Sequence, residues 1–292
     1  MKISIVTPSY NQAQFLEQTI LSVWGQEGDF ELEHIVMDGG STDKSIDILL
    51  KYDHLYKSNL FQFKCKSFKF IWKSRPDKGQ SDALNKGFAI SSGEFLGWLN
   101  SDDLFYDNNS LLKVCRAYDR YNTDLVVGNV VMIDEYKKTI DHPILINSLN
   151  DREFQEAMKG IGKICIIGQP SCFFKRAVWE KLGIDNYYYC MDWSLWINAY
   201  RSGYLFRKIP DYIGCMRQHA EAKTVIAGMN KCKEVLSLFK KNNVWCLNRF
   251  YYYIYLALLV SQKLPLIGEK LGLLMVVGKK IRNVLINKHR YY

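Results

Sequence analysis

Short apolar runs alternate with amphipathic segments along the chain up to residue 134. Five runs rich in β-branched and aromatic residues predict strands at 3–10, 33–38, 68–74, 94–103 and 123–134. The segments between them carry apolar residues at helical spacing and predict helices at 15–23, 41–52, 81–90 and 109–121. Asn11 is the expected cap of the first helix. This alternation predicts an α/β fold with a largely parallel sheet and right-handed crossovers.

Polar side chains stand where four of the predicted strands end. They are Asn11, Asp38, the segment 75–78 and the pair Asp102–Asp103. Ligands of open α/β sheets bind beyond the carboxyl ends of the strands, so these residues are expected to form one site. Two adjacent carboxylates are unfavourable unless a cation neutralises them, and a divalent metal that carries a phosphate group is one such cation.

The chain lacks the glycine patterns of two common phosphate sites. Neither G-x-G-x-x-G after the first strand nor G-x-x-x-x-G-K-[ST] anywhere is present, which disfavours a dinucleotide dehydrogenase and a P-loop NTPase. The carboxylates instead suit a uridine or ribose with a metal-bound diphosphate. Asp38 is a candidate acceptor for a base N–H or a ribose hydroxyl, and Lys78 is within reach of a phosphate.

Charge divides the chain of 292 residues into two parts. The whole carries +9, but residues 218–292 hold 13 Lys and Arg against three acids, while residues 1–217 are nearly neutral. We therefore expect a boundary near residue 218. Eight cysteines without a C-x-x-C pair argue against a zinc site and a secreted disulfide framework, and the start of the chain does not read as a signal peptide.

The basic C-terminal part has apolar stretches flanked by lysine and arginine. Residues 231–241 read as an amphipathic basic helix, residues 250–260 are uncharged but shorter than the about 20 residues that span a bilayer, and residues 272–290 repeat the pattern. This arrangement favours helices in the membrane interface, attracted by anionic headgroups. A helical subdomain packed on the body is the alternative. Nucleic acid is not expected, because no recognition fold is present.

Six motifs in order over residues 1–220 resemble a family 2 glycosyltransferase with the GT-A fold. They are ISIVTPSYN, VMDGGSTD, RPDKGQSDALNKGF, GWLNSDD, GQPSCFFKRAVWEKLG and CMDWSLWINAYRSG. The pair DKGQSDALNKG and GWLNSDD is similar to the bacterial branch that builds O-antigen, capsule and other surface polysaccharides. The resemblance implies a Rossmann-like, mostly parallel sheet at 1–217, with a nucleotide-binding half at 1–135 and an acceptor half at 136–217, followed by the helical extension 218–292.

The resemblance also implies roles for single residues. Asp38 matches the acid that contacts uracil, and Pro8, Tyr10 and Asn11 match the loop that lines the nucleotide pocket. The remaining matches are Asp102 for ribose and sugar, Asp103 for Mn²⁺ or Mg²⁺, Asp192 for the catalytic base and His219 for a histidine near the metal and the diphosphate.

Two positions depart from the family pattern. Gly39 stands where a second acid often follows the first, and Asn100 stands where the D-x-D element has its first acid. Fewer acids leave less negative charge for the metal. Structural alternatives also stay open, because Asp38 can shape a turn with Gly39 and Asp102 can cap a helix.

The expected reaction is transfer of a hexosyl or N-acetylhexosaminyl group from a UDP-sugar to a lipid-linked oligosaccharide. A single base, Asp192, implies one displacement and inversion at the anomeric carbon. The expected location is the cytoplasm, peripherally at the inner face of the cytoplasmic membrane. A nucleotidyltransferase and a non-catalytic sugar-nucleotide-binding protein are the alternatives, because a fold does not fix a function.

Overall fold

The computed structural model describes residues 1–140, 154, 167–223 and 228–242. The first half contains β1 Lys2–Ser9, α1 Leu16–Trp24, β2 Glu27–Asp38, α2 Ser45–Lys57, β3 Lys64–Ser74, α3 Gln80–Ile90, β4 Phe95–Trp98, β5 Leu104–Phe105, α4 Ser110–Tyr121 and β6 Leu125–Ile133. The second half contains a 3₁₀ turn at Gln169–Ser171, β7 Cys172–Lys175, α6 Arg176–Leu182, α7 Met191–Arg201, β8 Phe206–Arg217 and α9 Gly228–Lys241. The predicted strand–helix alternation is confirmed.

The strands form one eight-stranded sheet in the order β3-β2-β1-β4-β7-β6-β8-β5. The first four strands are parallel, which is the part that the sequence predicts, whereas β7 runs antiparallel to both β4 and β6. The short strand β5 pairs antiparallel with β8. This last pairing brings the chain after β4 beside the end of β8, more than 100 residues later in the sequence.

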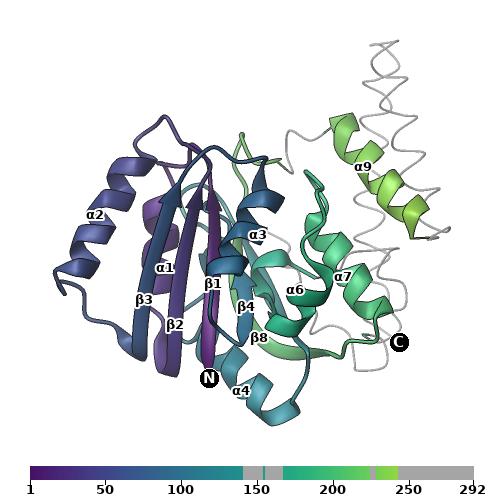
Figure 1. Ribbon diagram of the computed structural model, residues 1–292, viewed down its shortest axis with the longest axis horizontal. Helices are drawn as coiled ribbons and strands as arrows, with labels where there is room; N and C mark the ends of the chain where they lie inside the picture. Colours follow the sequence, from purple (N-terminus) through teal and green to yellow (C-terminus); the bar gives the residue numbers. More distant parts are fainter. Residues whose placement is uncertain (141–153, 155–166, 224–227, 243–292) are drawn as a thin grey trace. The chain divides into compact units, whose positions relative to one another are not determined.

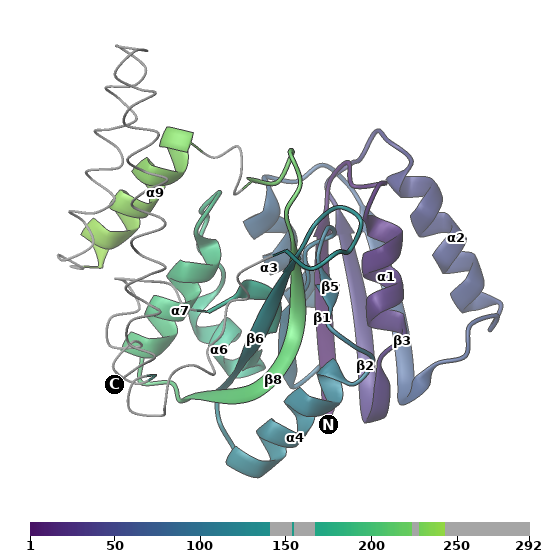
Figure 2. The ribbon, with the colours of Figure 1, turned by 180° about the vertical axis from the view of Figure 1, so that it is seen from behind.

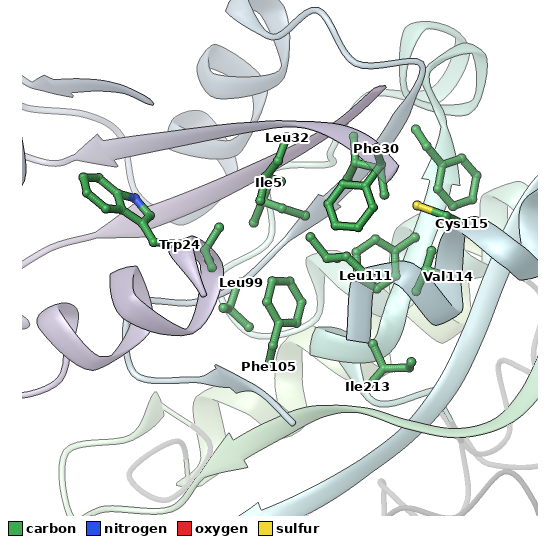
Figure 3. Packing of buried hydrophobic residues seen from close by; sticks show 14 of the residues in the cluster. Ile5, Trp24, Phe30, Leu32, Leu99, Phe105, Leu111, Val114, Cys115 and Ile213 are labelled. Carbon is green, nitrogen blue, oxygen red and sulfur yellow. The ribbon is translucent and has the colours of Figure 1, made fainter. Parts of the chain in front are cut away.

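One core lies between the sheet and helices α1, α2 and α4 (Figures 1, 2 and 3). At one end of this core the Trp24 ring contacts five aromatic rings with centroids 5.1–5.4 Å away: Tyr52, Phe61, Phe63, Phe68 and Phe70. Aromatic residues bury large apolar areas, and edge-to-face contacts of this kind add to that stabilisation. The cluster fixes the edge of the sheet that β2 and β3 form.

A second group of aromatic residues joins the opposite face of the sheet to α3, α6 and α7. Phe88 of α3 contacts Trp98, Phe174 and Trp179, and Trp196 of α7 stacks on Trp98 with centroids 5.7 Å apart. Trp98 and Trp196 are 3% and 0% exposed. The middle of α7 is therefore held against the end of β4.

The N-terminal end of α1 differs from the sequence-based prediction. Asn11 is not its cap, because the helix begins at Leu16 after a turn in which the amides of Phe15 and Leu16 donate to the carbonyl of Gln12. Asn11 adopts a positive φ of 52°, and its Oδ1 accepts a hydrogen bond from the Thr42 amide at 2.8 Å. Asn11 thus joins the loop after β1 to the loop after β2.

The chain divides into two compact units, one of residues 1–161 and 165–219 and one of residues 162–164 and 220–292. In the second unit the predicted basic helix is confirmed as α9, and its residues Cys232, Val235, Leu238 and Phe239 are buried. The apolar stretches at 250–260 and 272–290 lie outside the described residues. None of the described helices is both long and apolar enough to cross a bilayer.

Candidate functional site

The two adjacent acids lie in a tight turn between β4 and β5, and they have different surroundings. The Asp103 amide donates to the Asn100 carbonyl at 3.0 Å, which closes the turn. Asp103 is 2% exposed, and its oxygens accept hydrogen bonds from the Arg217 amide at 2.9 Å and from Asn100 Nδ2 at 3.1 Å. Burial, and then the charge of Asp102, raise the pKa of Asp103 well above its usual value. Neither acid caps α4, which begins after Asn109.

Asp102 is the more accessible of the two acids, and it faces a histidine from the end of β8. Its Oδ2 lies 3.1 Å from His219 Nε2, and the side chains of Asp102 and His219 are 23% and 6% exposed. The imidazole packs against the Phe15 ring with centroids 4.7 Å apart. The structure thus brings together two residues that are 117 positions apart. Among the described residues, no group of three or more His, Cys, Asp or Glu side chains forms a metal site.

The Arg217 side chain links the acidic turn to α1 and to the segment that follows β6. It is 2% exposed, and its guanidinium donates hydrogen bonds to the Asp102 carbonyl at 2.7 Å and to Gln18 Oε1 at 2.9 Å. It also donates to the carbonyls of Asp134 and Glu135 at 3.1 and 2.8 Å. Sequence reasoning missed this residue, because the partners of its side chain come from three separate segments and only the fold brings them together.

Asp38 shapes the turn that follows β2. It is 2% exposed, and its Oδ2 accepts hydrogen bonds from the amides of Gly40 and Ser41 and from Ser74 Oγ, at 2.6–3.0 Å. Its Oδ1 accepts from Ser41 Oγ at 2.5 Å. The turn-shaping role is therefore present, and the contact with uracil stays a prediction.

The other residues predicted for the nucleotide lie around this turn. Pro8 is buried near the end of β1, whereas Tyr10 is 59% exposed and Asn11 is exposed. The Asn11 amide donates to Ser41 Oγ at 2.8 Å, so the loop after β1 contacts the turn after β2. Lys78 has an exposed side chain, and its amide donates to Asp82 Oδ2 at 3.0 Å.

Gln80 connects the start of α3 to the acidic turn, which is formed by residues 100–103. It opens α3, and its Nε2 donates to Asn100 Oδ1 at 2.7 Å, while Asn100 Nδ2 in turn donates to Asp103. The next residue, Ser81, donates its hydroxyl to the Tyr187 carbonyl at 2.9 Å. The start of α3 therefore contacts both the acidic turn and the loop that precedes α7. The sequence reasoning did not select Gln80.

Asp192 lies in the first turn of α7, whose N-cap is Cys190. Its Oδ1 accepts a hydrogen bond from the following amide, that of Trp193, at 2.8 Å. The stacking of Trp196 on Trp98 holds the middle of α7 against the last residue of β4, and the loop before α7 contacts the start of α3 through the Tyr187 carbonyl. The catalytic role of Asp192 stays a prediction.

Comparison with known proteins identifies the fold and the family. A family model described as "Glycosyl transferase family 2" matches residues 4–183. An uncharacterized glycosyltransferase of Nostoc sp. is 29% identical over 68% of this chain and 58% of its own length. A PGL/p-HBAD biosynthesis glycosyltransferase of Mycobacterium tuberculosis is 34% identical over 44% of this chain and 46% of its own length. The chain thus spans about half the length of these curated relatives.

Two solved structures share the fold at low sequence identity. Residues 1–349 of TarS from S. aureus, in complex with UDP-GlcNAc, give a TM-score of 0.61 at 18% identity, covering 89% of this chain and 73% of TarS. The mannosyltransferase PcManGT from Pyrobaculum calidifontis, in complex with GDP-Man and Mn²⁺, gives a TM-score of 0.60 at 15% identity. The match covers 96% of this chain and 79% of the PcManGT chain. The predicted GT-A-type fold is confirmed by both.

Proposed function

The chain belongs to glycosyl transferase family 2, and we propose that it is a metal-dependent, inverting glycosyltransferase with a UDP-sugar donor. The observation that carries this proposal is the pairing of Asp102 with His219 beside the end of β4. Two structures with the same fold support the proposal: TarS was solved in complex with UDP-GlcNAc, and PcManGT in complex with GDP-Man and Mn²⁺. The transferred group is a hexosyl or N-acetylhexosaminyl unit.

Asp102 and His219 are the residues that would hold Mn²⁺ or Mg²⁺. Such ions often use only one or two protein side chains and complete their coordination with substrate phosphates and water. Asp103, to which the family resemblance gives the metal, is less suitable, because it is 2% exposed and both of its oxygens accept hydrogen bonds within the protein. Its role in this proposal is to fix the turn. A divalent ion, when bound, supplies Lewis-acid neutralisation of the leaving diphosphate.

The nucleotide would lie over the ends of β1 and β2. Pro8, Tyr10 and Asn11 follow or end β1 and contact the turn that Asp38 organises. Because Asp38 is almost fully engaged in this turn, it preforms the pocket, and the exposed Tyr10 provides a flat surface beside it. Lys78 has an exposed ammonium that can follow a phosphate.

Asp192 would act as the base. It takes the proton of the acceptor hydroxyl as the acceptor oxygen bonds to the anomeric carbon and the bond from that carbon to the diphosphate breaks. The proton passes from Asp192 to solvent, and UDP leaves. General-base catalysis of this kind contributes on the order of 10²–10⁴-fold. One displacement inverts the anomeric centre, so an α-linked donor gives a β-linked product.

The acceptor would be a lipid-linked oligosaccharide at the inner face of the cytoplasmic membrane, for the assembly of a bacterial surface polysaccharide. The support for this part is the basic segment 218–292 with 13 Lys and Arg against three acids. The buried apolar residues of α9 favour packing of that one helix within the protein, and its exposed Lys233 and Lys240 would contact the headgroups.

The reaction can be tested with a panel of UDP-sugars, Mn²⁺ and membrane-extracted or synthetic lipid-linked acceptors. Mass spectrometry should find the acceptor heavier by one sugar and free UDP, and NMR should find an inverted linkage. Asp192→Asn should lower kcat at least about 100-fold and keep UDP binding. An acceptor that gains a nucleoside monophosphate with release of pyrophosphate would instead establish a nucleotidyltransferase, and retained configuration would exclude a single displacement.

Membrane contact can be tested separately by sedimentation of the full chain with vesicles. We expect binding to vesicles that contain anionic lipid, lower binding at high salt, and little binding to neutral phosphatidylcholine vesicles. Equal recovery in the supernatant for both vesicle types would remove the membrane from the proposal.

A further inference from the structure

The hairpin that follows β6 presents an exposed aromatic side chain at its tip. Tyr136 is 81% exposed, more than any other large hydrophobic side chain in the part of the chain that the structure describes. A single exposed tyrosine is ordinary on a protein surface, so its surroundings decide whether it can serve a function.

The tip of the hairpin is ordered by its own hydrogen bonds. Asp134 Oδ1 accepts from the amides of Tyr136 and Lys138 at 2.9 and 2.8 Å, and the Asp134 amide donates to the Lys138 carbonyl at 2.9 Å. A bridge between Ile133 and Thr139 closes the hairpin. A tip that is already ordered loses little conformational entropy when it contacts a partner.

Arg217 holds the base of this hairpin beside the acidic turn. Its guanidinium donates to the carbonyls of Asp134 and Glu135 at 3.1 and 2.8 Å, and to the carbonyl of Asp102 at 2.7 Å. Strands β6 and β8 are parallel, with Ile133 opposite Arg217, so the hairpin and the acidic turn lie at the same edge of the sheet. The exposed tip therefore stands at the edge where the proposed transfer takes place.

Two lysines accompany the tyrosine at the tip. Lys137 and Lys138 are exposed beside Tyr136, against one exposed acid, Glu135. A tyrosine ring has an apolar body and a polar hydroxyl, which suits the boundary between water and lipid, and lysines beside it are attracted by anionic headgroups. The basic segment 218–292, proposed above to contact the membrane, begins in the sequence directly after β8, the strand that pairs with β6.

We propose that the hairpin tip Tyr136–Lys138 is a second membrane contact, which places the tyrosine ring in the headgroup layer and turns the active-site edge towards an anionic lipid surface. This inference rests on the proposed function and names the surface by which the same site meets a lipid-linked acceptor. The acceptor sugar is joined to its lipid and stays near the plane of the bilayer. Two separate contacts fix the orientation of the protein on that plane and strengthen each other.

The test is sedimentation of the full chain with phosphatidylcholine vesicles that contain about one-third phosphatidylglycerol. Tyr136→Ser should lower the partition coefficient roughly 3- to 10-fold, less than the loss expected for a fully buried ring. Lys138→Gln should lower it roughly fivefold at low salt and little at high salt. Tyr121→Ser is the matched control, because Tyr121 is 36% exposed and ends α4, just before β6 begins, so its binding should stay within about twofold of wild type.

A kinetic comparison separates the membrane from other partners of the tip. With a lipid-linked acceptor in the same vesicles, Tyr136→Ser should lower the rate of transfer in proportion to the lost vesicle binding. With a water-soluble acceptor that carries the same saccharide on a short chain, its kcat and KM should equal those of wild type. Its Mn²⁺-dependent UDP affinity should also be unchanged, and thermal unfolding checks that the variants fold.

The outcomes distinguish this contact from the proposed reaction. Equal vesicle binding of wild type, Tyr136→Ser and Lys138→Gln would overturn the contact and leave the proposed reaction standing. An equal loss of transfer to the soluble acceptor would also overturn it, because the tip would then contact the acceptor saccharide. Wild type that binds no anionic vesicle would overturn this inference and the membrane part of the proposal. Wild type that binds vesicles but transfers sugar to neither acceptor would overturn the proposed reaction and not the contact.

Discussion

Replacing Arg217 by methionine tests whether one buried guanidinium holds the acidic turn in place. The side chain donates four hydrogen bonds, to the carbonyls of Asp102, Asp134 and Glu135 and to Gln18, at 2.7–3.1 Å. Methionine has a similar length and fills the space, but it donates none of these hydrogen bonds. The substitution therefore removes the polar contacts and the positive charge with little change in packed volume.

The expected loss of stability follows from these contacts. Four hydrogen bonds at about 1 kcal/mol each give about 4 kcal/mol. The loss of one partner from a buried charged group typically costs about 3–5 kcal/mol, and Asp103 is the buried carboxylate whose pKa Arg217 helps to lower. Both routes give about 4 kcal/mol, a large part of the 5–15 kcal/mol typical of a folded protein. Arg217→Lys keeps the charge but not the planar fork, so we expect about half of that loss.

Urea unfolding followed by tryptophan fluorescence measures this effect. Arg116→Met is the matched control, because Arg116 is exposed on α4, and its change should stay within about 0.5 kcal/mol. Mn²⁺-dependent UDP affinity should fall in Arg217→Lys even where the variant is folded, because the Asp102 carbonyl loses its anchor. A loss below about 1 kcal/mol in Arg217→Met, with unchanged UDP affinity, would refute this reasoning.

Three further predictions concern other parts of the fold. Burial lowers the pKa of His34 to about 3, so the unfolded chain takes up a proton on this residue at a higher pH than the folded protein does. The free energy of unfolding should therefore fall by up to about 1.4 kcal/mol for each unit that the pH is lowered from about 6.5 to about 3. Urea unfolding of His34→Gln at a series of pH values should lack this part of the acid dependence. Gly87→Ala would place a Cβ 2.5 Å from Val6 Cγ1, and calorimetric or urea unfolding should find a loss of about 1–3 kcal/mol; an unchanged value would contradict the close packing of α3 on β1. Asp185 accepts hydrogen bonds from two side chains of α7, Ser194 and, at 3.2 Å, Asn198, and so helps to position the helix that carries Asp192. Asp185→Ala should therefore lower the kcat of transfer about tenfold and leave the UDP affinity unchanged. An equal loss of kcat and of UDP affinity would show a general structural role instead.

The parallel half of the sheet was predictable because its signals are local. The predicted ends at residues 38 and 74 coincide with the ends of β2 and β3, and the first predicted strand runs one residue past Ser9. The fourth was predicted too long: β4 ends at Trp98, not at residue 103, because the chain turns at 100–103. The start of β2 was not predictable from the same pattern: it begins at Glu27 rather than at residue 33, because Phe30 and Leu32 are buried among polar neighbours and a register shift interrupts the ladder between Gly28 and Glu31.

The chemical differences between neighbouring acids were less predictable. Sequence alone treats Asp102 and Asp103 as a pair, but the backbone turn buries Asp103 under the Arg217 amide and leaves Asp102 facing His219. Likewise Asp77 lies 39 positions after Asp38 in the sequence, yet its carboxylate packs beside Gly39, where a Cβ would come within 3.0 Å of Oδ2. Both arrangements depend on contacts between distant segments.

The measurement that tests the central claim most directly is UDP binding by calorimetry with and without Mn²⁺, for wild type and Asp102→Asn. The account predicts that wild type binds UDP only weakly without Mn²⁺ and that Asp102→Asn loses at least about tenfold of the Mn²⁺-dependent affinity. Asp53→Asn, which removes an acid that pairs with Lys57 on α2, should bind as wild type does. Equal UDP affinity with and without Mn²⁺, unchanged in Asp102→Asn, would contradict a metal–diphosphate site at Asp102 and His219.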